Sequence, residues 1–202
     1  MIKIKLCGLT RECDIEAANE LKPEYIGFVF AKKSKRYVTP ERAGILKGLL
    51  SDKIKAVGVF VNESPEVVAD LLNKGTIDMA QLHGDEDENY ITELRALTDK
   101  AIIKAFKVEK EEDLRLARIS SANYILLDSG AGSGKTFNWD ILKNVNRPFF
   151  LAGGLYPENV GEAVKKAMPY AVDVSSGIEK DGFKDKEKMT AFVEAIRKET
   201  SL

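Results

Sequence analysis

The stretch Tyr124–Trp139 joins an apolar run to a carboxylate and then to a glycine-rich loop. Residues 134–136 read Gly-Lys-Thr, which looks like the end of a nucleotide-binding P-loop. A P-loop needs a glycine five residues before Gly134, and that position holds Ser129, so the pattern disfavours a nucleotide triphosphatase. What remains is Asp128 at the end of a predicted buried strand. A carboxyl group there could act as a general acid if its surroundings raise its pKa.

Cys7 ends the first apolar run of the chain. A thiolate can act as a general base, although a free thiol with a pKa of about 8.5 is only partly ionised at neutral pH. Cysteine is also a common small buried apolar side chain, so both interpretations of Cys7 stay open at this point. Cys13 falls within a helical segment, and there we predict a core-filling role.

Two segments rich in glycine and serine follow the last two apolar runs. In barrels of eight parallel strands, the loops after strands seven and eight often bind phosphate through backbone N–H groups. Glycine allows the backbone to approach a ligand, and serine adds a hydroxyl donor, although tight turns also use glycine. The predicted phosphate-binding residues are Gly153, Gly154, Ser175, Ser176 and Gly177.

Two further side chains could contact a ligand. Arg36 lies in a basic loop, 31–38, where its guanidinium fork could hold a substrate carboxylate; a solvated loop charge is the alternative. His83, the only histidine, could line a substrate pocket or be a hydrogen-bonded structural residue. One histidine without a nearby cysteine or acidic cluster argues against a zinc site.

The elements that must position these residues recur regularly. Eight apolar runs of strand length begin mostly 23 or 24 residues apart: Ile2–Cys7, Tyr25–Phe30, Lys55–Phe60, Asp78–His83, Ala101–Val108, Tyr124–Asp128, Pro148–Ala152 and Ala171–Ser175. Amphipathic segments of helical period follow them: Glu12–Leu21, Pro40–Leu50, Pro65–Asn73, Glu88–Leu97, Glu111–Arg118, Trp139–Asn144, Glu158–Ala167 and Lys186–Lys198.

Nearly continuous apolar strands that alternate with helices predict parallel strands buried on both faces. Eight such units close naturally into a (β/α)₈ barrel, a TIM barrel of the α/β class, here as one domain over residues 1–202. A doubly wound open sheet is the alternative that the alternation also permits. A leucine-rich solenoid would need recurring leucine and asparagine positions, which these units do not share.

Composition excludes several partner classes. The chain has 31 Lys and Arg against 32 Asp and Glu, so no strong field favours nucleic acid or an anionic membrane. No apolar run has the length of a signal peptide or a membrane span. Two cysteines do not make a disulfide framework, and we therefore expect a reduced, cytoplasmic protein.

An ordered set of motifs resembles a known family, phosphoribosylanthranilate isomerase of tryptophan biosynthesis. The motifs stand at seven of the eight predicted strand ends and together span essentially the whole chain. They are Lys5–Thr10, Gly27–Phe30, Ser34–Val38, Val57–Phe60, Gln81–Gly84, Leu127–Ser129 with Gly132–Trp139, Leu151–Leu155 and Asp173–Glu179.

The resemblance implies a (β/α)₈ barrel that converts N-(5′-phosphoribosyl)anthranilate into an open-chain 1-deoxyribulose phosphate by an Amadori rearrangement. It implies no metal and no organic cofactor, a small phosphosugar substrate, and either a monomer or a homodimer. Carried over, Asp128 protonates the ribose ring oxygen and Cys7 removes the C2′ proton. Arg36 holds the anthranilate carboxylate, and the loops after strands seven and eight bind the phosphate.

Two alternatives differ from this resemblance. The related isomerases of histidine biosynthesis, and dual-substrate enzymes, carry an aspartate where this chain has Cys7. A silent barrel that only binds a phosphorylated metabolite would not need both Cys7 and Asp128. The glycine-rich loop then has another role: we expect Gly130, Gly132 and Gly134 to form a mobile loop that closes over the substrate and excludes water.

Overall fold

The computed structural model describes residues 1–130 and 138–200. Gly132 and Gly134, two of the glycines expected in the closing loop, lie outside the described residues. Within the described part, no helix is long and apolar enough to cross a membrane.

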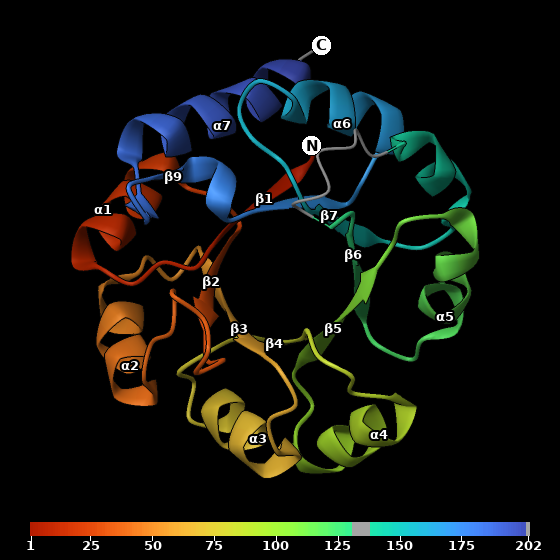
Figure 1. Ribbon diagram of the computed structural model, residues 1–202. Coiled ribbons are helices and arrows are strands. Elements are labelled where there is room, and N and C mark those ends of the chain that lie inside the picture. Colours follow the sequence, from red (N-terminus) through yellow and green to blue (C-terminus); the bar gives the residue numbers. More distant parts are fainter. Residues whose placement is uncertain (131–137, 201–202) are drawn as a thin grey trace.

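Eight parallel strands form a closed barrel in sequence order, and β8 pairs with β1 to complete it. Figure 1 looks into this ring, with the helices arranged around its outside. The predicted (β/α)₈ barrel is confirmed, and the open sheet is excluded by the β1–β8 pairing. The strands are β1 (Lys3–Cys7), β2 (Tyr25–Val29), β3 (Lys55–Phe60), β4 (Met79–Leu82), β5 (Ala101–Lys107), β6 (Tyr124–Asp128), β7 (Phe149–Ala152) and β8 (Ala171–Val174).

The α-helices follow the predicted amphipathic segments, and two of them begin with a proline behind a capping hydroxyl. Thr39 accepts a hydrogen bond from the backbone of Arg42, and Ser64 accepts one from the backbone of Val67. The helices are α1 (Glu12–Leu21), α2 (Pro40–Leu49), α3 (Pro65–Asn73), α4 (Glu88–Leu97), α5 (Leu114–Ile119), α6 (Val160–Ala167) and α7 (Lys186–Thr200).

Three short segments are 3₁₀-helices: η1 (Glu111–Asp113), η2 (Trp139–Asn144) and η3 (Ser176–Ile178). The segment over 139–144 therefore winds more tightly than an ordinary amphipathic helix. Short helical pieces often take the 3₁₀ form, and length alone does not decide the winding, because α5 is an α-helix of the same six-residue length. After η3 the chain forms a small antiparallel hairpin of β9 (Glu179–Lys180) and β10 (Phe183–Lys184).

The barrel interior has an apolar layer at the end where the strands begin. Phe150 lies there with its ring centroid 5.4 Å from that of Tyr25 and 5.8 Å from that of Tyr170. The larger core fills the space between the strands and the surrounding helices. Cys13 is exposed, so its predicted core-filling role is wrong: it lies on the outward face of α1.

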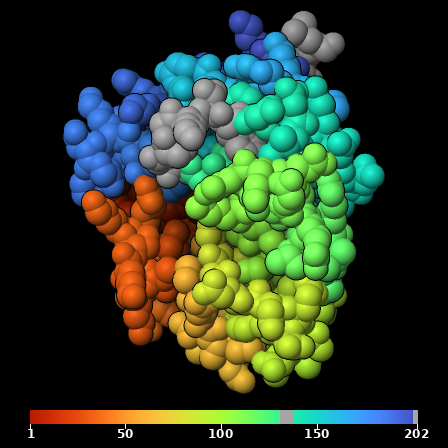
Figure 2. Space-filling view, turned by 45° about the vertical axis from the view of Figure 1, so that its right-hand side comes forward, coloured from red at the N-terminus to blue at the C-terminus, as the bar shows by residue number. Residues whose placement is uncertain are grey.

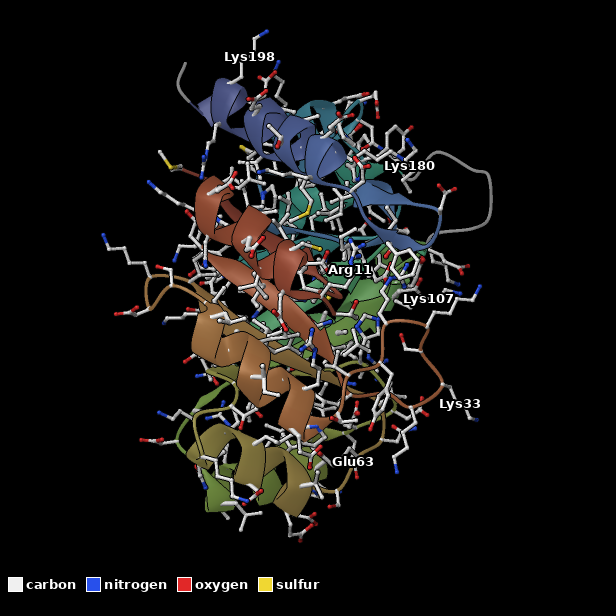
Figure 3. All side chains as sticks on the ribbon, turned by 90° about the vertical axis from the view of Figure 1, so that its left-hand side faces the viewer. Arg11, Lys33, Glu63, Lys107, Lys180 and Lys198 are labelled. Carbon is white, nitrogen blue, oxygen red and sulfur yellow. The ribbon has the colours of Figure 1, made fainter. Side chains whose placement is uncertain are left out.

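The loops that follow the strands gather at the other end of the barrel. Figure 3 shows Lys33, Lys107 and Lys180 at this end: Lys33 follows β2, Lys107 is the last residue of β5, and Lys180 follows β8. Figure 2 shows the surface hollowed between the orange and the green segments of the chain. Polar side chains at the strand ends therefore meet in one place, as expected for a barrel enzyme.

Candidate active site

A cavity of about 350 Å³ lies at this mouth and brings most of the predicted site residues together. Its lining includes Cys7, Arg36, His83, Asp128, Gly153, Gly154, Ser175 and Ser176. A larger adjoining hollow of about 760 Å³, between the β4 and β5 loops, shares His83 and Asp128 with it. Gly177 does not line the cavity: a Cβ there would lie 1.9 Å from the carbonyl oxygen of Leu155, so Gly177 lets the two loops pack together.

Cys7 is buried at the end of β1, and its sulfur lies 3.5 Å from the ammonium nitrogen of Lys5. Alternate residues of a strand share a face, so Lys5 and Cys7 both project into the barrel. Burial raises the pKa of the Cys7 thiol, and the negative charge of Asp173 raises it further. The positive charge of Lys5 lowers the pKa, but not enough to cancel the effect of burial. The free thiol is thus the favoured form of Cys7.

Lys5 is completely buried and makes three polar contacts. Besides the thiol, its Nζ donates to Gln81 Oε1 at 2.6 Å and to Asp173 Oδ2 at 2.9 Å. Burial alone would lower the pKa of Lys5, but Asp173 and Cys7 outweigh it and raise the pKa. Lys5 therefore places a positive charge beneath the cavity.

Asp128 ends β6 on another side of the mouth. The backbone N–H of Gly130 donates to its Oδ1 at 2.9 Å, and Nε2 of His83 lies 3.6 Å from its Oδ2. The His83 imidazole, supported by the Gly130 amide, lowers the pKa of Asp128 in spite of partial burial. The condition given for an acid role, surroundings that raise the pKa, is therefore not met by the free protein, because N–H groups face the carboxylate and favour its ionised form.

Gly153 holds the loop after β7 directly against Asp128. Its φ is +90°, and a Cβ would lie only 2.4 Å from Asp128 Oδ1. The hydroxyl of Ser129 also donates to the Gly153 carbonyl at 2.9 Å. The predicted phosphate loop and the predicted acid are therefore parts of one packed unit, and glycine is required at this position.

Arg36 is not a solvated loop charge. Its Nε and Nη2 bind the two oxygens of Glu179, at 2.5 and 2.8 Å, in a fork-to-fork pair. Lys184 donates to the same carboxylate at 2.6 Å and to the carbonyl of Ser175 at 2.9 Å. The Nη1 group of Arg36 is not part of the pair, so the fixed guanidinium can still meet an anion in the cavity it lines.

The sequence analysis missed the functional placement of Lys5 and Asp173. Both are charged residues inside apolar runs, and such residues are rarely buried unless they are paired. Lys5 also precedes Cys7 by two residues, which places both on one face of a strand. Both signals are visible in the sequence, but the sequence does not show that Lys5 pairs with Asp173 and Gln81.

The cavity thus offers a thiol, a carboxyl group and an arginine on a rigid frame, which suits proton transfer to and from an anionic substrate. Within residues 1–130 and 138–200, no group of three or more His, Cys, Asp and Glu side chains could hold a metal ion. A family model described as N-(5′-phosphoribosyl)anthranilate (PRA) isomerase matches residues 4–195. The chain belongs to this isomerase family.

Relatives within the isomerase family cover the chain almost completely. An N-(5′-phosphoribosyl)anthranilate isomerase from Thermoanaerobacter sp. (strain X514) is 47% identical, over 98% of this chain and 98% of its own length. One from Endomicrobium trichonymphae is 45% identical, over 98% of this chain and 99% of its own.

Solved structures of the family share the fold. Phosphoribosyl anthranilate isomerase from Thermotoga maritima is 37% identical and covers 98% of this chain and 100% of its own, with a TM-score of 0.90. Another phosphoribosyl anthranilate isomerase structure, in complex with reduced 1-(o-carboxyphenylamino)-1-deoxyribulose 5-phosphate, is 36% identical, with the same coverage and a TM-score of 0.87. Thiamine phosphate pyrophosphorylase from Pyrococcus furiosus, at 15% identity and a TM-score of 0.72 over 98% of this chain and 96% of its own, shares the fold alone.

Proposed function

We propose that this chain isomerises N-(5′-phosphoribosyl)anthranilate to 1-(2-carboxyphenylamino)-1-deoxyribulose 5-phosphate, with Asp128 as the general acid and Cys7 as the general base. The observation that carries these roles is that Cys7 and Asp128 line one cavity from different strands. In the first step, Asp128 protonates the ribose ring oxygen, and the bond from that oxygen to C1′ breaks to leave a Schiff base. In the second, Cys7 removes the C2′ proton, and the resulting enolamine tautomerises to the ketone.

The reaction needs a proton on Asp128 and none on Cys7. The free protein favours the opposite distribution, because burial raises the pKa of the thiol while His83 and Gly130 lower that of the carboxyl group. Both distributions contain one proton, so the reactive form arises when that proton moves from sulfur to carboxylate. A bound substrate that expels water from Asp128 favours the neutral acid, and Lys5 and Lys184, which oppose the rise in the pKa of Cys7, favour the thiolate that must form with it.

The remaining cavity residues are proposed to orient the substrate. Arg36 would hold the anthranilate carboxylate, since its guanidinium is kept rigid by Glu179. The backbone of Gly153 and Gly154 and the hydroxyl of Ser176 would bind the phosphate where the loops after β7 and β8 meet.

We further propose that residues 1–202 act as one domain, without a cofactor, in the cytoplasm. A thiol that must shed its proton has to stay reduced, and a reducing compartment protects it. A monomer and a homodimer are both compatible with the site, because Cys7, Arg36 and Asp128 all come from one chain.

The test is turnover of N-(5′-phosphoribosyl)anthranilate, followed as loss of its fluorescence. The variants Asp128→Asn and Cys7→Ser should each lower kcat by at least ~10², the contribution of a positioned acid or base. Circular dichroism and thermal melting must show both variants folded. Near-normal turnover in either folded variant would remove that residue from its proposed role.

A further inference from the structure

Five side chains form a continuous line from the base to the acid beneath the cavity. Lys5 Nζ lies 3.5 Å from the sulfur of Cys7 and donates to Gln81 Oε1 at 2.6 Å. Gln81 Nε2 lies 2.8 Å from Nδ1 of His83, and Nε2 of the same ring lies 3.6 Å from Asp128 Oδ2. The line runs from β1 to the end of β4 and on to β6.

The chemistry of these groups assigns a direction to every hydrogen bond in the line. A lysine ammonium can only donate, so the glutamine atom that faces Lys5 must be the carbonyl oxygen. The amide nitrogen of Gln81 then faces His83, and an amide nitrogen also only donates. Nδ1 of His83 must therefore accept, which leaves the ring hydrogen of the neutral imidazole on Nε2, the atom that faces Asp128.

We propose that Lys5 is a positioning residue that, through Gln81, fixes His83 in the tautomer with hydrogen on Nε2 and so presents an N–H group to the Asp128 carboxylate. The consequence for the reaction rests on the proposed roles of Asp128 and Cys7. When Asp128 has given its proton to the ring oxygen, it becomes a carboxylate, and an N–H facing it stabilises that product of the first step. The other neutral tautomer would direct a lone pair at the carboxylate instead.

Lys5 also serves the base, because its ammonium lies 3.5 Å from the Cys7 sulfur and has the strongest lowering effect on the thiol pKa among the described charged groups. Within residues 1–130 and 138–200, Asp173, Lys184 and Arg36 are further charged groups that interact electrostatically with the thiol. Complete burial of a lysine costs desolvation free energy, and an apolar side chain of similar size would often leave the protein equally stable. A role for Lys5 in the site accounts for that cost: one ammonium stabilises the thiolate and orders the partner of the acid.

The tautomer can be measured without any activity assay. His83 is the only histidine, so two-bond ¹H–¹⁵N correlation spectra of the labelled protein above neutral pH show a single imidazole. The wild type should show hydrogen on Nε2 and a bare Nδ1. The opposite tautomer, or an equal mixture, would overturn the proposal even if the enzyme is fully active.

Gln81→Glu is the sharpest variant, because it keeps the shape and the contact with Lys5 while removing the donor. A carboxylate can only accept, so His83 should move its hydrogen to Nδ1 or bind a second proton. Lys5→Met should release the Gln81 amide and give a mixture of tautomers. Retention of the pure Nε2–H form in Gln81→Glu would overturn the proposal, and retention in Lys5→Met would remove Lys5 from it.

Kinetics then link the tautomer to the reaction. Gln81→Glu should lower kcat about 10-fold or more and leave KM within about 3-fold of the wild type. This loss is smaller than the ~10⁴ loss of kcat in enzymes whose general base is a histidine held in the wrong tautomer. Lys3→Met is the matched control, since Lys3 lies two residues earlier on the same strand face but contacts Tyr170 at the far end. It should change neither the tautomer nor kcat.

The outcomes separate the parts of the proposal. If the tautomer shifts in Gln81→Glu as predicted while kcat stays unchanged, the link to Asp128 fails but the order of the hydrogen bonds stands. If the wild type itself is inactive, the proposed function fails instead.

Discussion

Replacing Gly153 with alanine should damage catalysis far more than stability. The added Cβ would lie 2.4 Å from Asp128 Oδ1 and 2.7 Å from the backbone nitrogen of Ser129, whereas ordinary contact begins near 3.4 Å, so the carboxylate must move by about 1 Å together with the backbone that follows it. A misplacement of about 1 Å in a reacting group can cost ~10² in rate. The positive φ of +90° adds a backbone cost of about 1–2 kcal/mol for alanine.

The matched control is Gly75→Ala, which carries the same backbone cost without the clash. Gly75 has a φ of +74°, follows α3, and has no atom within 4 Å of the added Cβ. Each kcal/mol should lower Tm by about 2–4 °C in a chain of this size, so both variants should melt a few degrees early, and Gly153→Ala earlier than Gly75→Ala because its Cβ also meets the Ser129 backbone. Only Gly153→Ala should lose ~10² in kcat, measured by the fluorescence assay on protein shown to be folded.

The reasoning fails if Gly153→Ala keeps kcat within about 3-fold of wild type while its Tm falls with that of Gly75→Ala. That result would mean that Asp128 tolerates displacement, or that the loop moves away from it at no cost to the reaction. Equal losses of kcat in the two variants would instead indicate a global effect of strain.

Three further predictions follow from the electrostatics and the lining of the cavity. kcat/KM should follow a bell-shaped dependence on pH, with the acidic limb set by the lowered pKa of Asp128 and the basic limb by the raised pKa of Cys7. Since the positive charge of Lys5 lowers the pKa of Cys7, Lys5→Met should move the basic limb to higher pH. A basic limb at unchanged pH would contradict the assignment of that limb to Cys7. Arg36→Met should raise KM by about 10-fold or more, as expected when a charged hydrogen bond worth about 1.5–3 kcal/mol is lost, whereas a change confined to kcat would argue against carboxylate binding. Inorganic phosphate should compete with substrate, and Ser176→Ala should weaken that competition; purely noncompetitive inhibition would place phosphate elsewhere.

Much of the fold was predictable because its signals are local. The bounds of β3 and β6 and of helices α1, α3 and α4 agree with the predicted ranges residue for residue. Apolar runs and amphipathic segments reflect the backbone periods of strands and helices, which are properties of neighbouring residues. Segment 139–144 was predicted as an ordinary helical segment and is 3₁₀, because periodicity over six residues does not distinguish the two windings.

The candidate site was predictable in its members but not in its electrostatics. Cys7 and Asp128 stand at strand ends, and parallel strand ends meet at one mouth once the sheet closes. The pairing of Arg36 with Glu179 joins residues 143 positions apart, so no local pattern could separate it from a solvated charge. Cys13 shows the converse error, since membership of a helix does not tell which face a residue takes: Asp14, Ile15, Ala17 and Ala18 are the buried residues of α1, and Cys13 is exposed.

The sequence by itself determined the order of eight strand–helix units, and the positions of Asp128, Cys7 and the two glycine-rich loops along the chain. Only the tertiary structure decided that β8 closes on β1, that Lys5 meets Gln81 and Asp173, and that the pKa of Asp128 is lowered while that of Cys7 is raised. The physical reason is distance. Periodicity is a property of adjacent residues, whereas a protonation state depends on burial and on charges that closure of the barrel brings from 76 and 168 residues away.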